Sequence, residues 1–293
     1  MKLKHIYRIV CLLLVLAACS PTPKKPRAYG NPCEVWVKDS AGILAGMLSQ
    51  PYGGLPQKEP AFDVRPLPDA WKEHVQRFAR CLVIYDAATP LRMARNSYAQ
   101  GQTIIYTNGQ CDTLYIYRVL QAQQLAWQVA QLKHRHNEWA EALVDSVFGC
   151  SVLLPPDMQR SHCADNFLWL ANQHPTQMRN ICFFRLPTMQ SLAVTIDSIL
   201  QRNLPGEEEG MYLQVGRFLR KRTPAPGMRA CCWYGEGRWE MVGDAMGGPA
   251  ALAVYAMGKE YLGALVFVYA PGHAKRNDMV SLKAILQTVR MRV

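Results

Sequence analysis

Residues 238–249 read Arg-Trp-Glu-Met-Val-Gly-Asp-Ala-Met-Gly-Gly-Pro, and a long apolar stretch follows them. In the Trp-Glu-Met-Val run, Trp and Met occupy one face of an extended chain and Glu and Val the other. Gly-Gly-Pro at 247–249 predicts a tight turn into the next strand. The segment therefore predicts antiparallel strand pairs over residues 230–242 and 250–269.

Helical patterns lie before and after these strands. We expect a long helical stretch over residues 111–148, a later helix capped by Thr188 and a last helix capped by Asn277. Runs of strands separate these helices. This order predicts an α+β fold in which antiparallel sheets carry helices packed on one face. It divides into an N-terminal α+β half with the long helix (33–150) and a C-terminal α+β half (151–293).

One short pattern occurs in both halves. A helix, a Leu-Pro breaker, a Glu and a strand follow one another from Leu48 to Phe62 and again from Leu200 to Tyr212. An old duplication would produce this pattern, and so would a chance similarity between helix-to-strand turns. Two related halves are therefore one of two interpretations of the fold.

The N-terminus has the features of a lipoprotein signal. Residues 9–19 read Ile-Val-Cys-Leu-Leu-Leu-Val-Leu-Ala-Ala-Cys, and three cations precede them. This run is shorter than the roughly 20 residues that cross a bilayer, and it fits the apolar region of a secretory signal. We expect cleavage between Ala18 and Cys19, which removes a signal peptide (1–18) and leaves Cys19 for lipid attachment. An ordinary secretory signal that contains a cysteine is the alternative.

The next residues predict a spacer and a cellular location. Residues 19–32 are rich in Pro and Lys, which predicts an extended spacer. Ser20 follows the lipidated cysteine directly. In Gram-negative sorting, an Asp at that position retains a lipoprotein in the inner membrane. Ser20 therefore favours a cell-envelope location, with the lipid in the outer membrane and the body facing the periplasm.

The net charge of the chain indicates which classes of partner it could bind. There are 33 Lys and Arg residues against 22 Asp and Glu, a formal net charge of +11. A hydrophobic content of 49% marks a chain that buries a substantial core. In a protein that carries an export signal, a basic net charge favours an anionic envelope polymer or another envelope protein as the binding partner. No nucleic-acid-binding signature accompanies the charge, so we expect membrane contact through Cys19 and no nucleic-acid partner.

Two segments are candidate binding sites. Glycines near residue 247 would let a ligand approach the backbone, and the candidate ligand-binding residues are Trp239, Glu240 and Asp244. A bulged hairpin with a capping Asp explains the same residues. A second, cationic segment would contact an anionic surface through Arg217, Arg220, Lys221 and Arg222. A solvated loop is the alternative interpretation there.

No recognised catalytic or metal motif is present. The sequence lacks GxSxG, P-loop, HExxH and GxGxxG patterns. His134 and Glu138 are four residues apart, but a solvated helix face explains them. In His162-Cys163, adjacent side chains on an extended chain point apart and cannot form an activated pair. We therefore assign no catalytic residue, metal or cofactor, and expect a non-catalytic binding or structural lipoprotein. The alternative is an envelope hydrolase with an unrecognised carboxylate site near Glu240 and Asp244.

Several motifs together resemble one family. They are Gly54-Leu55-Pro56, Phe167-Leu168-Trp169, Gly210-Met211-Tyr212, Trp239-Glu240-Met241, Gly243-Asp244-Ala245-Met246-Gly247-Gly248-Pro249 and Phe267-Val268-Tyr269-Ala270-Pro271. The chain resembles an uncharacterised family of Bacteroidetes lipoproteins, a domain of unknown function of the DUF4837 type. The resemblance implies an envelope lipoprotein. It brings no assigned activity, cofactor or catalytic residue.

Overall fold

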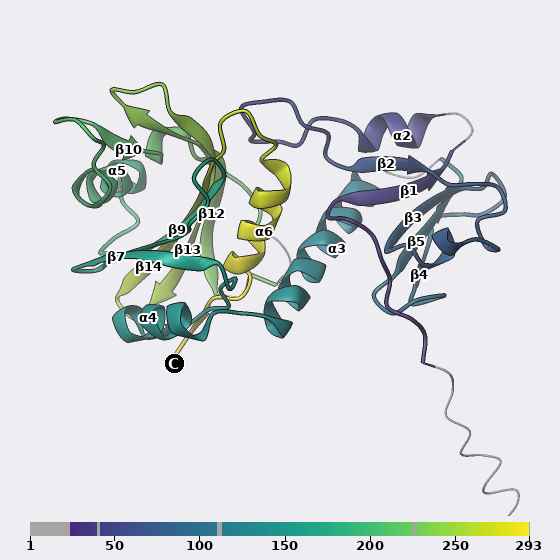
Figure 1. Ribbon diagram of the computed structural model, residues 1–293, viewed down its shortest axis with the longest axis horizontal. Coiled ribbons are helices and arrows are strands. Elements are labelled where there is room, and N and C mark those ends of the chain that lie inside the picture. The colour runs from purple at the N-terminus through teal and green to yellow at the C-terminus, as the bar shows by residue number, and fades with distance from the viewer. Residues whose placement is uncertain (1–23, 40–41, 110–112, 225–226, 229, 293) are drawn as a thin grey trace, which may run out of the picture.

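The computed structural model describes residues 24–39, 42–109, 113–224, 227–228 and 230–292. The predicted signal peptide and Cys19 lie outside these residues. The described chain forms two lobes, and a long helix runs between them (Figure 1). Among the described residues, no helix combines the length and apolar character needed to cross a membrane. The predicted α+β class is confirmed, because helices and two main β-sheets build both lobes.

The N-terminal lobe contains a five-stranded sheet in the order β2-β1-β3-β5-β4. Its strands are β1 Glu34–Lys38, β2 Asp63–Pro66, β3 Cys81–Tyr85, β4 Arg92–Arg95 and β5 Thr103–Thr107. The first four strands of that order run parallel, and only the edge strand β4 is antiparallel to its neighbour. The antiparallel prediction was wrong for this sheet. Its central strand β3 is a continuous apolar run that is buried on both faces, which is typical of parallel sheets.

Helices cover one face of this sheet. The helices α2 (Ile43–Leu48) and α3 (Thr113–His134) pack there against Val35, Val83 and Ile105. The N-cap position of the short helix α2 is Gly42, and Asp39 accepts from one of its first amides: the Leu44 amide donates to Asp39 Oδ2 at 2.6 Å. The opposite face packs against a loop that contains the buried Trp71. Within that loop, η1 (Val75–Phe78) is a single 3₁₀ turn.

The C-terminal lobe contains an eight-stranded antiparallel sheet in the order β10-β12-β13-β14-β9-β8-β7, with β11 paired to β12. The strands are β7 Met158–Ala164, β8 Phe167–Asn172, β9 Met178–Leu186, β10 Tyr212–Gln214, β11 Arg220–Lys221, β12 Cys231–Val242, β13 Gly247–Met257 and β14 Glu260–Tyr269. A short pair, β6 (Cys150–Ser151) with β15 (Arg290–Met291), lies beside it. The predicted strand pair over residues 230–242 was wrong, because these residues form one continuous strand, β12; the pair over 250–269 corresponds to β13 and β14, and the three strands are neighbours in this sheet.

Helices lie on both faces of the C-terminal sheet, whereas the sequence predicted one face. The helices α4 (Glu138–Phe148) and α6 (Arg276–Leu286) share a core with one face. The helix α5 (Leu192–Asn203) and the turn η2 (Gly216–Phe218) pack on the other. Strands β9, β13 and β14 are apolar on both faces, so each face needs a cover.

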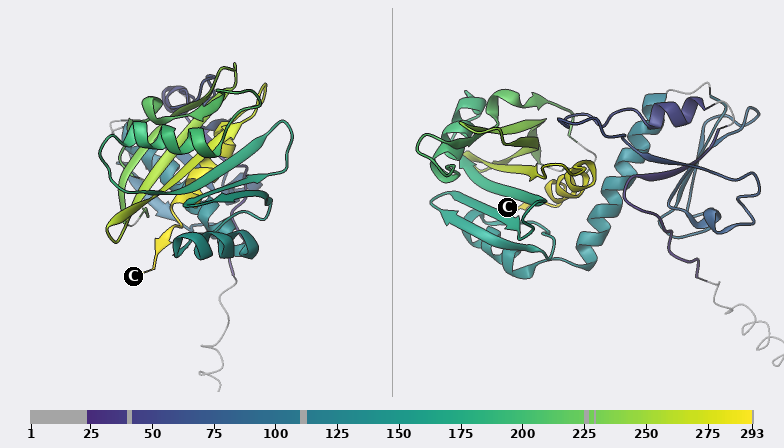
Figure 2. Two further views of the ribbon diagram at one scale, coloured as in Figure 1. Left: turned by 90° about the vertical axis from the view of Figure 1, so that its left-hand side faces the viewer. Right: turned by 45° about the horizontal axis from the view of Figure 1, so that its top comes forward.

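The long helical stretch predicted at 111–148 is two helices. It breaks between α3 and α4, where Asn137 caps α4 by accepting from the Ala140 amide at 3.1 Å. The break separates His134 from Glu138, so these side chains do not share a helix face. Figure 2 shows α3 crossing between the lobes before the chain turns into α4.

Two further predictions differ from the structure. The two lobes have different strand orders and strand directions, so the described strands do not form two related halves. The hairpin turn lies at residues 243–246, with Gly243 at φ +87°, and Gly247 and Pro249 already belong to β13. The register explains this placement, because Gly247 pairs with Glu240 across the two strands.

The last part of the predicted tether belongs to the folded body. The Ala28 amide donates to the Gln100 carbonyl at 2.8 Å, and the Gln100 amide donates to Pro26 at 2.8 Å. The Arg80 amide donates to Tyr29 at 2.8 Å. Residues 26–30 therefore lie along the N-terminal lobe, and the predicted spacer ends near residue 25.

Candidate functional site

The C-terminal sheet carries α5 on one face, and an aromatic groove crosses the part of that face that α5 leaves uncovered. Its volume is about 680 Å³. It is formed by side chains from six strands, the turn between β12 and β13, the end of α5 and the residues that follow α5: His162, Trp169, Met178, Asn180, Arg202, Asn203, Leu204, Pro205, Leu213, Trp239, Met241, Met246, Phe267 and Tyr269. The floor is apolar, and Arg202 and His162 are exposed at the rim.

Rings that contact one another form the floor of the groove. Trp239 lies 5.4 Å from Phe267 and 6.2 Å from Tyr269, measured between ring centroids. Trp169 and Tyr269 are partly exposed, whereas Trp239 is 3% exposed. The partly exposed rings offer flat apolar faces to a ligand, and the buried Trp239 packs against one of them, Tyr269.

Each indole in the groove has its own hydrogen-bond partner. The Trp239 Nε1 donates to the Val268 carbonyl at 2.9 Å, and the Trp169 Nε1 donates to Asn180 Oδ1 at 3.0 Å. These bonds hold both rings in place before any ligand arrives. Fixed rings lose little conformational entropy on binding, which favours recognition.

The structure separates the residues predicted around Trp239. Glu240 points away from the groove and forms an ion pair with Arg217. Asp244 lies exposed in the turn, where its Oδ1 accepts from the Ala245 amide at 2.6 Å. Neither carboxylate lines the groove. Of the three predicted ligand-binding residues, only Trp239 belongs to it.

The predicted cationic segment is exposed along its length. Arg217, Arg220, Lys221 and Arg222 are all solvent-exposed on η2, on β11 and just after it. Arg217 is paired with Glu240, and the Arg217 and Arg238 guanidinium groups lie 4.6 and 4.5 Å from the Phe218 ring. The segment therefore presents cations, but Arg217 already has an acidic partner.

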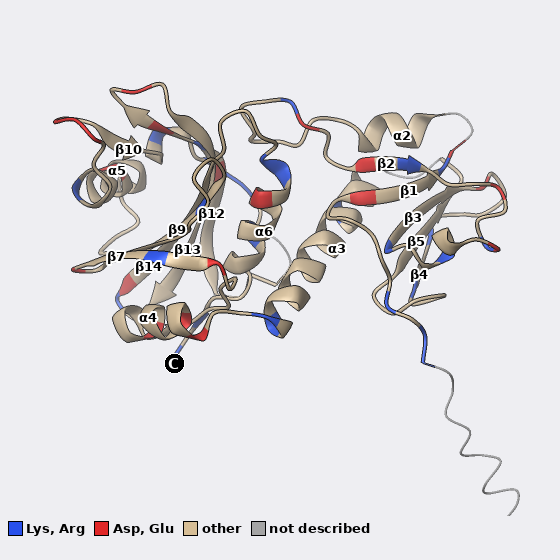
Figure 3. Ribbon diagram, viewed as in Figure 1, with Lys and Arg blue, Asp and Glu red and all other residues tan. Residues whose placement is uncertain are grey.

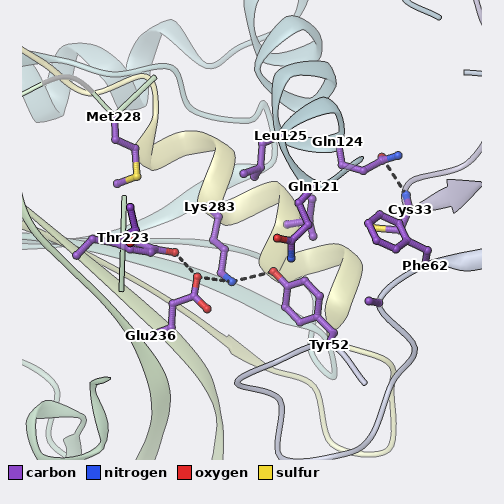
Figure 4. Close-up of a pocket in the computed structure, with 13 residues that line it drawn as sticks. Cys33, Tyr52, Phe62, Gln121, Gln124, Leu125, Thr223, Met228, Glu236 and Lys283 are labelled. Carbon is purple, nitrogen blue, oxygen red and sulfur yellow. Dashed lines mark hydrogen bonds and ion pairs between the residues drawn. The ribbon is translucent and has the colours of Figure 1, made fainter. Parts of the chain in front are cut away.

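A second, smaller cavity lies between the lobes. Its volume is about 90 Å³, and its lining includes Tyr52 from the N-terminal lobe, Gln121 from α3, Glu236 from β12 and Lys283 from α6. Figure 4 shows Lys283 between Tyr52 and Glu236. The Lys283 Nζ lies 2.7 Å from the Tyr52 hydroxyl and 2.8 Å from Glu236 Oε1. The Tyr234 hydroxyl also donates to Glu236.

The charge states in this cavity are set by burial and by the ion pair. Burial opposes the charge on Lys283, but Tyr52 and Glu236 outweigh it and raise the pKa of this ammonium. Burial also opposes the charge on Glu236, yet Lys283 and the hydrogen bond from Tyr234 lower the pKa of that carboxyl below 4.5. Burial raises the pKa of the Tyr52 hydroxyl and raises that of the Cys33 thiol to about 11. Each of these four pKa shifts takes the group further from pH 7. Near pH 7, therefore, each group keeps a single charge state.

Contacts around the cavity join the lobes. Arg276, at the start of α6, forms a bidentate pair with Asp63 at 2.6 and 3.1 Å and donates to the Pro60 carbonyl at 2.7 Å. Glu59 accepts from the Lys275 and Arg276 amides at 2.7 and 2.8 Å. The described residues contain no group of three or more His, Cys, Asp or Glu side chains placed to hold a metal ion.

Family models match both parts of the chain. A model described as a domain of unknown function (DUF4837) matches residues 137–288, just over half of the chain. The chain belongs to the DUF4837 family. A second model, also described as a domain of unknown function (DUF8532), matches residues 32–142. The DUF4837 match includes the eight-stranded sheet and therefore the whole aromatic groove.

Solved and curated proteins add little to this assignment. A crystal structure from Bacteroides thetaiotaomicron VPI-5482 shares 12% sequence identity over 49% of this chain and 45% of its own, with a TM-score of 0.29. At that TM-score the likeness supports no argument. No curated protein matches the chain.

Apart from Trp239, the sequence did not predict the residues that line the two cavities of this DUF4837 protein. Trp169 and Tyr269 are far from Trp239 in the sequence, and only the strand order brings them together. Lys283 carried a usable signal, because it follows Met279 and Val280 by four and three residues on a buried helix face. A lysine on such a face needs a partner. The sequence does not indicate that Tyr52 and Glu236 provide it.

Proposed function

We propose that this DUF4837 protein is a lipid-anchored, non-catalytic binding protein of the cell envelope, and that the aromatic groove holds its ligand. The groove itself carries the proposal. It combines about 680 Å³ of open volume with fixed aromatic rings and a polar rim. An apolar floor with a few convergent polar groups is the usual form of a binding site.

The arrangement of acidic groups favours binding over hydrolysis. A hydrolase of the kind considered above needs Glu240 and Asp244 to converge on one substrate. Glu240 is instead paired with Arg217, and Asp244 accepts from its own turn. In the interlobe cavity, Lys283 is held protonated and Glu236 ionised, so neither is poised to exchange a proton near neutral pH.

The groove fits an envelope glycan that carries anionic groups. The apolar C–H face of a sugar ring matches the flat, partly exposed rings of Trp169 and Tyr269. At the rim, Arg202 is positioned to pair with an anionic substituent and Asn203 to hydrogen-bond a hydroxyl. The net positive charge of the chain would draw such a polymer toward the protein. The Cys19 motif supports an envelope location for this encounter.

Co-sedimentation of the purified chain with isolated peptidoglycan and with lipopolysaccharide tests this function. We expect Trp169→Ala and Tyr269→Ala each to weaken binding about tenfold, since each removes one stacking face. The matched control is Trp139→Ala, because Trp139 is 55% exposed on α4, across the sheet from the groove.

Two results would contradict the proposal. Equal affinities for the groove variants and the Trp139 control would exclude the groove as the site. Absence of binding to either polymer would exclude an envelope glycan as the ligand, and would leave a partner protein as the occupant to test.

A further inference from the structure

The docked end of the tether lies beside the edge strand β4. The Lys25 Nζ donates to the Asn96 carbonyl at 2.7 Å, and Asn96 directly follows β4. Arg27 forms a β-bridge with Gln100 a few residues further on. These contacts place the start of the described chain next to one end of the N-terminal lobe. Figure 3 shows basic positions both on this part of the chain and in the neighbouring sheet.

This end of the lobe is exposed and strongly basic. We name it the tether-proximal patch, formed by Lys24, Lys25, Arg27, Arg92 and Arg95, all of which are exposed. No acidic side chain forms an ion pair with any of these five among the described residues. The sequence supplies no acid nearby, because 20–33 and 87–110 contain neither Asp nor Glu.

Apolar side chains interrupt the cations. Leu91, directly before β4, and Met93, within it, are 41% and 38% exposed. The Arg92 guanidinium lies over the Tyr106 ring at 4.5 Å, which holds one cation near the strand surface. Cations with interspersed exposed apolar side chains suit a bilayer interface, where anionic head groups meet acyl chains.

Chain geometry brings this patch close to the membrane if Cys19 is lipidated. From Cys19 to the docked Pro26 there are seven residues, and a fully extended chain of that length spans at most about 25 Å. We propose that the tether-proximal patch rests on the anionic phospholipid surface of the bilayer that holds the anchor. The inference rests on the lipid anchoring in the proposed function, and it adds an orientation: the N-terminal lobe faces the membrane and the aromatic groove is held away from it.

Vesicle sedimentation tests the patch without the anchor. The probe is a vesicle of phosphatidylcholine with or without phosphatidylglycerol, and the protein is the chain from Ser20 onward, which includes every described residue. We expect binding only to vesicles with phosphatidylglycerol. Arg92→Gln with Arg95→Gln should weaken it about thirty-fold, the value for loss of two interfacial cations. The matched control, Arg220→Gln with Lys221→Gln, removes the same charge from β11 in the C-terminal lobe and should change binding little.

A second variant keeps the test valid if the β4 variant fails to fold. Lys24→Gln with Arg27→Gln removes two cations before the first strand and should weaken binding to a similar extent. Equal effects of the patch and control variants would overturn the proposal. Binding to lipopolysaccharide or peptidoglycan without binding to phosphatidylglycerol vesicles would also overturn it.

Cys19→Ser in cells tests the anchor separately. If lipid labelling persists in this variant, the proposed anchoring at Cys19 is wrong, whatever the vesicles show. If labelling is lost but the patch variants bind vesicles as the control does, the anchor stands and the proposed orientation fails.

Discussion

Gly248 is the residue that allows the floor of the groove to form. It pairs with Trp239 across β12 and β13, and the indole lies over its backbone. A Cβ at this position would lie 2.8 Å from the Trp239 Nε1 and 2.2 Å from the Val268 carbonyl oxygen. These are the two atoms that form the buried hydrogen bond of the floor. The glycine is therefore needed for close approach of a ring and a neighbouring strand.

We expect Gly248→Ala to lower the free energy of unfolding by about 2–3 kcal/mol, because the added methyl forces the indole or a strand to shift. Urea unfolding followed by tryptophan fluorescence measures this. Gly46→Ala is the control, since nothing lies within 4 Å of a Cβ there and the site is an exposed helix position. It should be neutral or stabilising. A Gly248→Ala protein as stable as this control would show that the contact relaxes freely.

At the scale of elements, α6 illustrates how a distant segment sets the start of a helix. The sequence places a capping residue at Asn277, but the helix begins at Arg276. Its first free amides donate to Glu59, which is more than two hundred residues away in the sequence. Asn277 instead accepts from the Arg276 guanidinium at 3.0 and 3.1 Å. An acidic group at a helix N-terminus satisfies free amides and complements the helix dipole.

Glu59→Ala should therefore destabilise the protein by about 1–2 kcal/mol, the usual value of a lost N-cap. Thermal unfolding of the variant beside Glu73→Ala measures this, because Glu73 is exposed and its side chain caps no helix in the described chain. Equal melting temperatures for the two variants would show that water replaces the carboxylate at α6 without cost.

At the scale of the whole molecule, the Tyr52–Lys283–Glu236 network couples the two lobes. Glu236 has a lowered pKa in the folded state, so its contribution is present above about pH 4.5 and is lost as the pH falls through the folded pKa. Lys283 has a raised pKa, so its contribution is present below about pH 10.5 and is lost as the pH rises through the folded pKa. The coupling should be strongest between these limits.

We expect Glu236→Gln to cost about 3 kcal/mol at neutral pH, at the lower end for a broken buried pair, because the Glu236 side chain keeps 23% exposure. The difference from the unaltered protein should shrink as the pH falls below about 4.5 and should be lost below the folded pKa of Glu236, where both proteins lack the carboxylate charge. Urea midpoints across this pH range measure it. Glu260→Gln is the control, since Glu260 pairs with Arg185 at the surface with 49% side-chain exposure and should cost below about 1 kcal/mol. A difference that stays constant with pH would exclude the ion pair as its source.

The sequence by itself determined the local features of this protein. Alternating and continuous apolar runs predicted extended chain within residues 230–269, because this signal depends on residues close in the chain. The lipoprotein-like motif at Cys19 is equally local.

Only the tertiary structure decided which distant segments of the chain are neighbours. Strand order brought Trp169 and Tyr269 to Trp239, and lobe packing brought Tyr52 and Glu236 to the buried Lys283. It also made the N-terminal sheet mostly parallel and placed α5 on the second face of the C-terminal sheet. The physical reason is that each of these outcomes depends on burying apolar area and pairing charges between segments distant in the chain, and local patterns of residues do not specify which distant segments meet.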